Sequence, residues 1–141
     1  MIEVINRQRS RKLNTKPLCQ FAERALRHIA STKQSVTIVF VGDASIRRLN
    51  RQFRGKDRVT DVLSFPTRAE PFETENQSSL GEVVISIQRA AAQAKQNGLT
   101  FSNEVEQLIL HGLLHLCGYD HETDNGEMNR LELRLRRKLR I

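Results

Sequence analysis

The sequence predicts an α/β (α+β) fold in which a mixed, mostly parallel sheet of about four strands packs against helices. Short β-branched apolar segments alternate with segments of helical periodicity, in the order β-α-β-α-β-β-α-α-α. Two of the strands follow each other without a helix between them, which argues against a purely doubly wound sheet. The 141 residues suffice for one hydrophobic core, so residues 1–141 are expected to form a single domain.

Four segments are short, apolar and rich in β-branched residues, as strands are. They are 2–6, 35–41, 60–65 and 80–85. Pro66 is expected to close the third strand. The polar segment 67–79 lies between the third and fourth strands and predicts a surface loop of a kind that is often mobile or functional.

Five segments carry apolar residues at helical spacing. They are 15–29, the stretch between Asp43 and Gly55, 86–96, a stretch that ends near residue 116, and 122–139. Polar residues mark three of the helix starts: Thr15, Asp43, and either Ser102 or Asn103. Glu106 then stands at the N3 position counted from Asn103, close to a capping box. Glycines are expected to end helices at Gly55, Gly98 and Gly118.

The charge balance favours a polyanionic partner. The chain has 23 Lys and Arg against 16 Asp and Glu, for a net charge of +7. Nucleic acid or an anionic membrane surface would suit this excess, and a soluble protein with a basic surface suits it equally well. Aromatic residues are only 5% and Trp is absent. A platform for stacking bases is therefore poorly supplied, and phosphate contacts should dominate if RNA binds.

The expected location is the cytoplasm, or alternatively an organelle matrix. No segment approaches the roughly 18 apolar residues that a membrane helix needs. The basic N-terminal segment lacks the apolar core of a secretory signal. Cys19 and Cys117 do not suggest a disulfide framework, in agreement with a reducing compartment.

The segment 108–122, LILHGLLHLCGYDHE, carries three histidines at a spacing that predicts a metal site. His111 and His115 lie one helical turn apart, about 6 Å along the axis and on one face. His121 follows Gly118, where the chain can fold back to the same point. Imidazole nitrogen is a preferred zinc ligand, and three protein ligands leave one position open. The alternative is that these are core histidines bonded to backbone carbonyls.

The remaining circumference of this helix is apolar, so the helix and its two imidazoles are expected to be buried. Cys117 falls about 160° from His115 on a helical wheel, which indicates a small buried hydrophobe rather than a fourth ligand. His28 is expected on a helix surface.

An open fourth position predicts a catalytic metal, which lowers the pKa of bound water to about 7. Three imidazoles also accept nickel, copper or iron.

Two neighbouring positions bear on the chemistry of this site. The zinc-peptidase pattern H-E-x-x-H places a glutamate base after the first histidine, and here that position is Gly112, which counts against peptide hydrolysis. Asp120 is either a hydrogen-bond acceptor for a ligand histidine or a turn residue that caps the last helix.

Three blocks of the sequence resemble the YbeY family of bacterial rRNA-maturation factors, described as single-strand-specific endoribonucleases. The signature H-G-x-L-H-L-x-G-Y-D-H is matched at 111–121. The block N-x-x-x-R-x-K-D-x-x-T-D-V-L-S-F-P is matched at 50–66, and L-G-D-hydrophobic-hydrophobic-I resembles 80–85. Glu82 stands where the family usually has Asp, Val59 where Pro often occurs, and Cys117 in place of a common Leu.

The resemblance implies a zincin-like fold and one Zn²⁺ per chain, or Ni²⁺ or another divalent metal, on His111, His115 and His121. It implies catalytic roles for Arg54 and His111. It also implies action on ribosomal RNA in 3′-end maturation of 16S rRNA, ribosome biogenesis and rRNA quality control. The implied partners are ribosomal RNA and the small ribosomal subunit, with ribosomal proteins and a ribosome-associated GTPase, and no membrane.

The residues themselves also point to a phosphate-binding segment. Six cations crowd it: Arg47, Arg48, Arg51, Arg54, Lys56 and Arg58. A solvated helix face explains several of them. Arg54 differs because it stands at the helix exit, just before the strand 60–65. A guanidinium binds phosphate as a fork and stabilises charge that develops during phosphoryl transfer.

Weaker candidates lie nearby. Lys56, Arg51 and Ser64 are expected to contact substrate, and Asp61 could orient Arg54 or a ligand histidine. A strand side chain and a turn residue are the structural alternatives for Ser64 and Asp61.

The last helix is basic and amphipathic, which fits either an ordinary surface helix or an electrostatic RNA or ribosome contact. Two other functions compete with the ribonuclease. One is a metallohydrolase of peptides or small molecules, and the other is a ribosome-assembly factor whose metal is mainly structural.

Overall fold

Four strands form a sheet in the order β1-β2-β4-β3 in the computed structural model of the chain, which describes residues 1–30, 34–67, 79–120 and 122–141. The strands are β1 (Ile2–Asn6), β2 (Ser35–Val41), β3 (Val62–Pro66) and β4 (Ser79–Ser86). β1 and β4 both pair with β2 in parallel, and β3 pairs with β4 antiparallel. The prediction of a four-stranded, mostly parallel sheet is confirmed. Of the predicted loop 67–79, residues 68–78 lie outside the described part of the chain.

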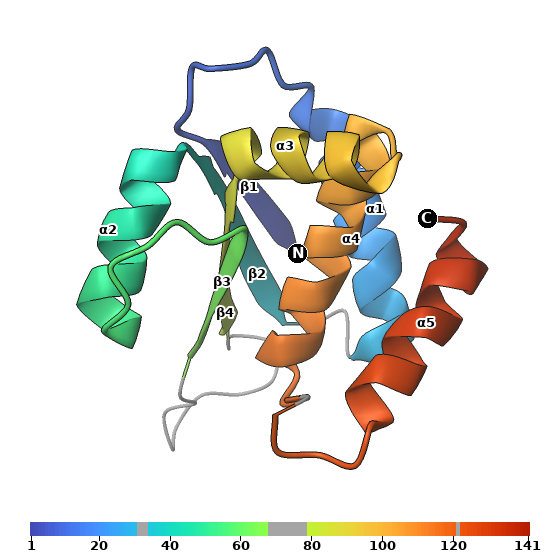
Figure 1. Cartoon of the computed structure of the whole chain (residues 1–141). Helices are drawn as coiled ribbons and strands as arrows, with labels where there is room; N and C mark the ends of the chain where they lie inside the picture. The colour runs from blue at the N-terminus through green and yellow to red at the C-terminus, as the bar shows by residue number, and fades with distance from the viewer. Residues whose placement is uncertain (31–33, 68–78, 121) are drawn as a thin grey trace.

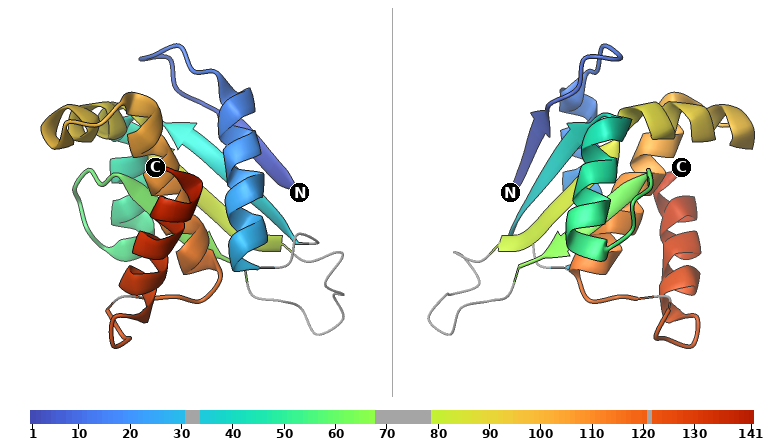
Figure 2. Two further views of the ribbon diagram at one scale, coloured as in Figure 1. Left: turned by 90° about the vertical axis from the view of Figure 1, so that its right-hand side faces the viewer. Right: turned by 60° about the vertical axis from the view of Figure 1, so that its left-hand side comes forward.

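Helices cover both faces of this sheet (Figures 1 and 2). They are α1 (Thr15–Ile29), α2 (Asp43–Arg54), α3 (Ile87–Asn97), α4 (Phe101–Leu116) and α5 (Glu127–Leu139). α2 lies on one face, where Ile46 packs with Leu63 and Val84. On the other face α4 lies against the sheet, and α1 and α5 pack beside it around the main core. Among the described residues, no helix is both long enough and apolar enough to cross a membrane.

The alternation of side chains along β2 explains why the two faces differ. Ile38 and Phe40 are fully buried and belong to the main core, whereas Val41 faces the small cluster beneath α2. α4 contributes Ile109, Leu110 and Leu113 to the main core. Its buried position follows from the apolar residues that surround most of its circumference.

Several predicted helix starts differ from the structure. The N-caps of α1 and α2 are Asn14 and Gly42, each one residue before the predicted cap. The N-cap of α4 is Thr100 rather than Ser102 or Asn103, because the Thr100 hydroxyl oxygen accepts a hydrogen bond from the Asn103 amide at 3.1 Å. Glu106 therefore lies beyond the capping position that its spacing suggested.

α5 begins at Glu127, five residues later than expected, because carboxylates hold the preceding chain in turns. Asp120 accepts a hydrogen bond from the Glu122 amide at 3.0 Å. Asp124 accepts from the amides of Gly126 and Met128, both at 2.9 Å. Gly126 has φ +95°, a backbone conformation that interrupts helical geometry.

Candidate active site

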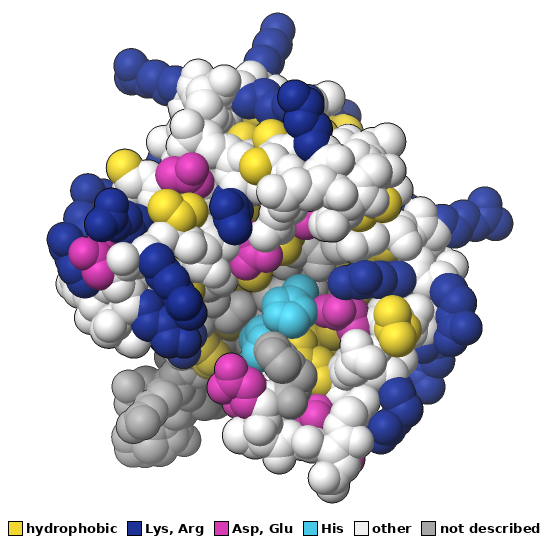
Figure 3. Space-filling view, in the orientation of Figure 1, with side chains coloured by type: hydrophobic (Ala, Val, Ile, Leu, Met, Phe, Trp, Pro, Cys, Tyr) yellow, Lys and Arg dark blue, Asp and Glu magenta, His cyan; other side chains and the backbone are white. Residues whose placement is uncertain are grey.

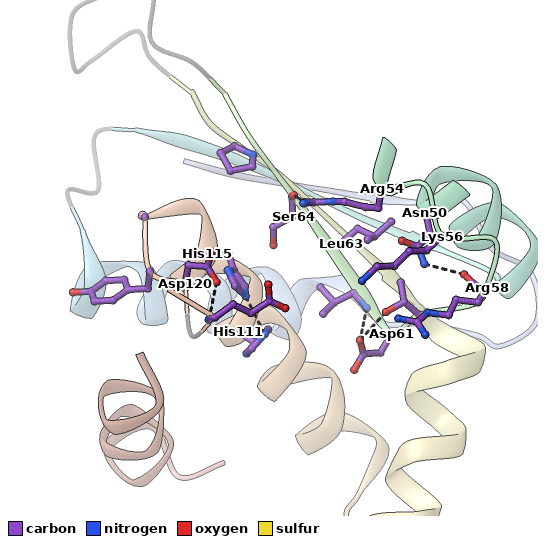
Figure 4. Close-up of a pocket in the computed structure, with 16 residues that line it drawn as sticks. Asn50, Arg54, Lys56, Arg58, Asp61, Leu63, Ser64, His111, His115 and Asp120 are labelled. Atoms are coloured by element: carbon purple, nitrogen blue, oxygen red, sulfur yellow. Dashed lines mark hydrogen bonds between the residues drawn. The ribbon is translucent and has the colours of Figure 1, made fainter. Parts of the chain in front are cut away.

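A groove of about 520 Å³ opens between the C-terminal half of α4 and the segment that joins α2 to β3 (Figures 3 and 4). Arg54, Lys56 and Arg58 come from the α2 side, and His111 and His115 come from α4. Two segments that lie more than 50 residues apart in the sequence thus form the two walls of one groove.

The two described histidines lie side by side in this groove. Their Nε2 atoms are 3.2 Å apart, and their ring planes are inclined at 76°. The prediction that spacing four residues apart puts both rings on one face is confirmed. The expectation that the rings are buried is wrong, because both residues are half-buried and the His111 side chain is 30% exposed. The imidazole stripe faces the groove, whereas the apolar residues of α4 face the core. His121 lies outside the described residues.

Glu132 of α5 binds the far side of the His111 ring. Its Oε1 lies 2.7 Å from His111 Nδ1, and its Oε2 accepts a hydrogen bond from Arg136 Nη2 at 3.0 Å. Glu132 is 8% exposed. When Nδ1 carries the proton that Glu132 accepts, the Nε2 lone pair of His111 is directed into the groove.

The charges around Glu132 keep its carboxylate ionised. Burial acts to raise the pKa of this carboxyl, but the hydrogen bond from His111 and the positive charges near it outweigh burial. The pKa of Glu132 is therefore held below its ordinary value. An ionised carboxylate on Nδ1 is the arrangement that commonly orients a metal-binding histidine in proteins.

Sequence reasoning did not single out Glu132, although the last helix carried a signal. Its buried stripe consists of Met128, Glu132, Leu135 and Leu139. One carboxylate interrupts an otherwise apolar stripe, and a buried charge requires a partner. The packing of α5 against α4 determines that the partner of Glu132 is His111.

Gly112 allows α4 to approach the sheet closely. A Cβ at this position would lie 2.5 Å from Val83 Cγ1 and 3.4 Å from Ser64 Oγ. Val83 and Ser64 are register partners on β4 and β3. Ser64, 8% exposed, donates a hydrogen bond to the Gly112 carbonyl at 3.3 Å. The place of the peptidase glutamate is thus filled by the sheet, which has no room for a side chain there.

Arg54 extends from the end of α2 across β3. Its Nη2 donates a hydrogen bond to the Ser64 carbonyl at 2.6 Å, and its guanidinium carbon lies 5.9 Å from the centre of the Phe65 ring. Arg54 is exposed and lines the groove. One of its five N–H donors is anchored to the strand, so the remaining fork can meet a phosphate in the groove.

Asn50 holds the loop that carries the other groove cations. It is 3% exposed, and its amide donates to the Arg58 carbonyl at 3.0 Å. Its own carbonyl accepts from the Lys56 amide at 3.3 Å. Lys56 and Arg58 both line the groove, and Arg58 is a groove residue that the sequence did not single out.

Arg51 lies away from the groove on the exposed face of α2. Asp57 faces this region, with Oδ1 2.9 Å from Arg47 Nε and 4.0 Å from Arg51 Nη1. The hydrogen bond from Arg47 lowers the pKa of Asp57. Asp57 therefore neutralises part of the cationic segment outside the groove, and it pairs with Arg47 and Arg51 rather than with the three cations that line the groove.

Asp61 and Asp120 both stabilise backbone turns. Asp61 Oδ1 accepts from the Val62 amide at 2.8 Å, which differs from the suggestion that Asp61 orients Arg54 or a histidine. The Asp120 carboxylate accepts from the Glu122 amide, so the turn interpretation describes its contacts. Asp120 also lines the groove next to the histidines (Figure 4).

The pair of described histidines fits a shared metal ion. Among the described residues, no three His, Cys, Asp or Glu side chains are placed to hold one, and the third predicted ligand is outside them. In a tetrahedral zinc site with Zn–N bonds of 2.0–2.1 Å, two ligand nitrogens lie about 3.3 Å apart. The observed 3.2 Å matches this separation. Cys117 is partly buried against the core, and burial raises the pKa of its thiol, which disfavours the thiolate a metal needs.

Comparison with known proteins confirms the resemblance found in the sequence. A family model of YbeY, described as "Endoribonuclease YbeY", matches residues 3–140. The chain is 47% identical over 120 residues to a protein from Solibacter usitatus that bears this name, covering 85% of this chain and 76% of the relative. A Geobacter metallireducens protein of the same name is 38% identical over 136 residues, covering 96% and 91%.

A solved structure agrees with the fold. The solution structure of TM1509 from Thermotoga maritima superposes with a TM-score of 0.66 at 30% identity, covering 99% of this chain and 89% of that chain. The groove, its two histidines and the cations opposite them thus belong to a sequence that matches one family along nearly its whole length. The chain is a member of the YbeY endoribonuclease family.

Proposed function

We propose that this chain is a metal-dependent endoribonuclease that cleaves phosphodiester bonds in single-stranded RNA. One observation carries the proposal: Arg54, Lys56 and Arg58 face the paired imidazoles of His111 and His115 across one groove. A cationic wall suits a phosphodiester backbone, and paired imidazole nitrogens suit a cation that activates water. The names of the relatives agree with this chemistry.

The metal is proposed to be Zn²⁺, or Ni²⁺ or another divalent ion, held by His111, His115 and His121. When bound, it would supply a Lewis acid and a water molecule of lowered pKa at the scissile phosphate. Glu132 fixes the His111 ring so that Nε2 points into the groove. The proposed site has the three-histidine arrangement of a zincin-like fold.

The protein's own groups position the substrate. Arg54, anchored to the Ser64 carbonyl, would bind the non-bridging oxygens of the scissile phosphate and stabilise the charge that builds up on them. Lys56 and Arg58 would bind neighbouring phosphates. Ser64 acts mainly by joining β3 to α4 through Gly112. The lack of room at Gly112 argues against a peptidase base at that position.

We further propose that the substrate is ribosomal RNA in the cytoplasm, cleaved during 3′-end maturation of 16S rRNA and rRNA quality control. The small ribosomal subunit, its proteins and a ribosome-associated GTPase would be the partners. The net charge of +7 supports a polyanionic partner of this kind. Residues 1–141 would act as a single domain.

The test is cleavage of small-subunit precursor RNA by the pure protein, with and without a chelator, and after zinc is restored. His115→Ala and Arg54→Ala should each abolish cleavage, and zinc should remain bound to the Arg54 variant. Arg47→Ala is the matched control, because this arginine pairs with Asp57 outside the groove. Full activity of Arg54→Ala, or cleavage that survives complete metal removal, would contradict the proposal. RNA binding without any metal-dependent cutting would favour an assembly factor.

A further inference from the structure

The exposed face of α5 is strongly cationic and lies outside the groove. Residues 127–140 contain six Lys and Arg residues and two carboxylates. Five of them are exposed, and four of these lie within α5 at spacings of three or four residues. They are Arg130, Arg134, Arg137 and Lys138, here called the α5 stripe. Residues at this spacing share one face of a helix, so the α5 stripe forms a row about 12 Å long.

The opposite face of α5 is committed to the interior. Met128, Leu135 and Leu139 are buried in the main core, and Glu132 binds His111. The one large apolar side chain that α5 exposes is Leu133, at 47%. A single exposed leucine is far less than the apolar face with which amphipathic helices insert into a lipid surface. A partner of the α5 stripe is therefore expected to bind mainly by charge, as a phosphodiester backbone does.

The cations of the α5 stripe are not neutralised as other arginines of this chain are. Asp57 pairs with Arg47, and Glu132 pairs with Arg136. Within the described residues, Arg134, Arg137 and Lys138 form no ion pair. Like charges at these spacings weaken a helix. Repulsion between these cations therefore destabilises α5, and a bound polyanion would reduce this repulsion.

The α5 stripe is also well placed relative to the groove. α5 contacts His111 through Glu132, on the side of the ring that faces away from the groove. In the space-filling view, Lys and Arg side chains gather over α2 on one side of the histidines and over α5 on the other (Figure 3). A strand with one phosphate at the histidines would meet α2 cations in one direction and α5 in the other.

We propose that the α5 stripe is a second phosphate-binding surface, which holds the RNA segment flanking the one in the groove. This inference rests on the proposed function, because it takes the groove to be the site that receives RNA. RNA then binds over both walls of the groove. The bound segment extends past the scissile phosphate over α5.

The experiment compares two charge-matched variants. The first carries R134Q, R137Q and K138Q on the α5 stripe. The second carries R27Q, R89Q and K95Q at exposed positions on α1 and α3. Binding of a labelled single-stranded RNA of about 30 nucleotides is measured by fluorescence anisotropy over a range of salt concentrations. The α5 variant should bind about tenfold more weakly, and the slope of log K against log salt should fall by about 2, since each lost contact removes about 0.7.

The affinity of the control variant for the long RNA should lie within about twofold of that of the wild type. With an RNA of about five nucleotides, the difference in affinity between the two variants should be much smaller than with the long RNA. Equal weakening by both variants would reduce the effect to net charge and overturn the proposal. Unchanged RNA binding would overturn it too. So would RNA binding that is kept while binding to phosphatidylserine vesicles is lost, which would assign the α5 stripe to a membrane.

Cleavage by the wild type is measured in parallel. A wild type that binds RNA through the α5 stripe but never cuts it would contradict the proposed function and leave this inference standing. If the wild type cuts RNA and the α5 variant binds RNA normally, the proposed function stands and this inference is contradicted. Thermal unfolding of both variants checks that each remains folded.

Discussion

Glu132 Oε1 lies 2.7 Å from Nδ1 of His111, a residue 21 positions earlier in the chain. The contact joins α5 to α4 at the wall of the groove. Arg136 binds the second carboxylate oxygen, so the carboxylate is held from both sides. A histidine held this way presents Nε2 in a constant direction, which is what a ligand to a metal requires.

Glu132→Gln should therefore weaken zinc binding by about 10- to 100-fold, the usual effect of removing a carboxylate that orients a ligand histidine. Glutamine keeps the size of the side chain but lacks the negative charge. Zinc affinity would be measured by competition with a coloured chelator, with E23Q on the exposed face of α1 as control. Equal affinity for both variants and the wild type would show that Glu132 has no part in metal binding.

Gly112→Ala should destabilise the protein by about 1–3 kcal/mol, because a Cβ 2.5 Å from Val83 Cγ1 overpacks the contact between α4 and the sheet. The free energy of unfolding would be measured with urea. Val83→Ala makes room for the new Cβ. The loss in free energy of unfolding of the double variant should therefore be smaller than the sum of the losses of the two single variants. Strictly additive effects would mean that the two residues do not compete for space.

Thr100→Ala should cost about 1 kcal/mol, because it removes the hydrogen bond to the Asn103 amide at the start of α4. Ser102→Ala is the matched control: Ser102 was a predicted cap but lies inside the first turn. It should change the stability by no more than about 0.5 kcal/mol. A larger loss at Ser102 than at Thr100 would place the helix start where the sequence suggested.

Glu104→Gln should become relatively more favourable as the pH rises. Burial raises the pKa of Glu104, an effect that the charge of Asp61 reinforces and a hydrogen bond from Asn97 reduces. A raised pKa means that the stability contributed by Glu104 is present below the ordinary pKa and lost as the pH rises through the folded value. The stability of the variant relative to the wild type should increase between about pH 4 and pH 7.

Asp57→Asn provides a comparison of opposite sign. Arg47 lowers the pKa of Asp57, so its contribution is present above the ordinary pKa and lost as the pH falls through the folded value. The relative stability of this variant should decrease as the pH rises to about 4–5, which is below the range in which the relative stability of Glu104→Gln increases. Two parallel trends would mean that the pH dependence arises elsewhere in the molecule.

Local structure and the family resemblance could be predicted from the residues alone. Residues 2–6 and 35–41 form strands with the predicted bounds. The preference of β-branched apolar residues for strands is a local property, so it can be recognised in a segment of a few residues. The pairing of His111 with His115 on one face followed from helical geometry alone.

The packing of helices and strands sets which groups meet at the groove. It brought Glu132 to His111, turned Arg54 and Lys56 toward the histidines, and left Arg51 near Asp57. α5 begins only at Glu127, because hydrogen bonds to Asp120 and Asp124 hold the preceding residues in turns. The physical reason is the same in each case: periodicity reports which face of an element is apolar, but a polar side chain's partner depends on how the elements pack.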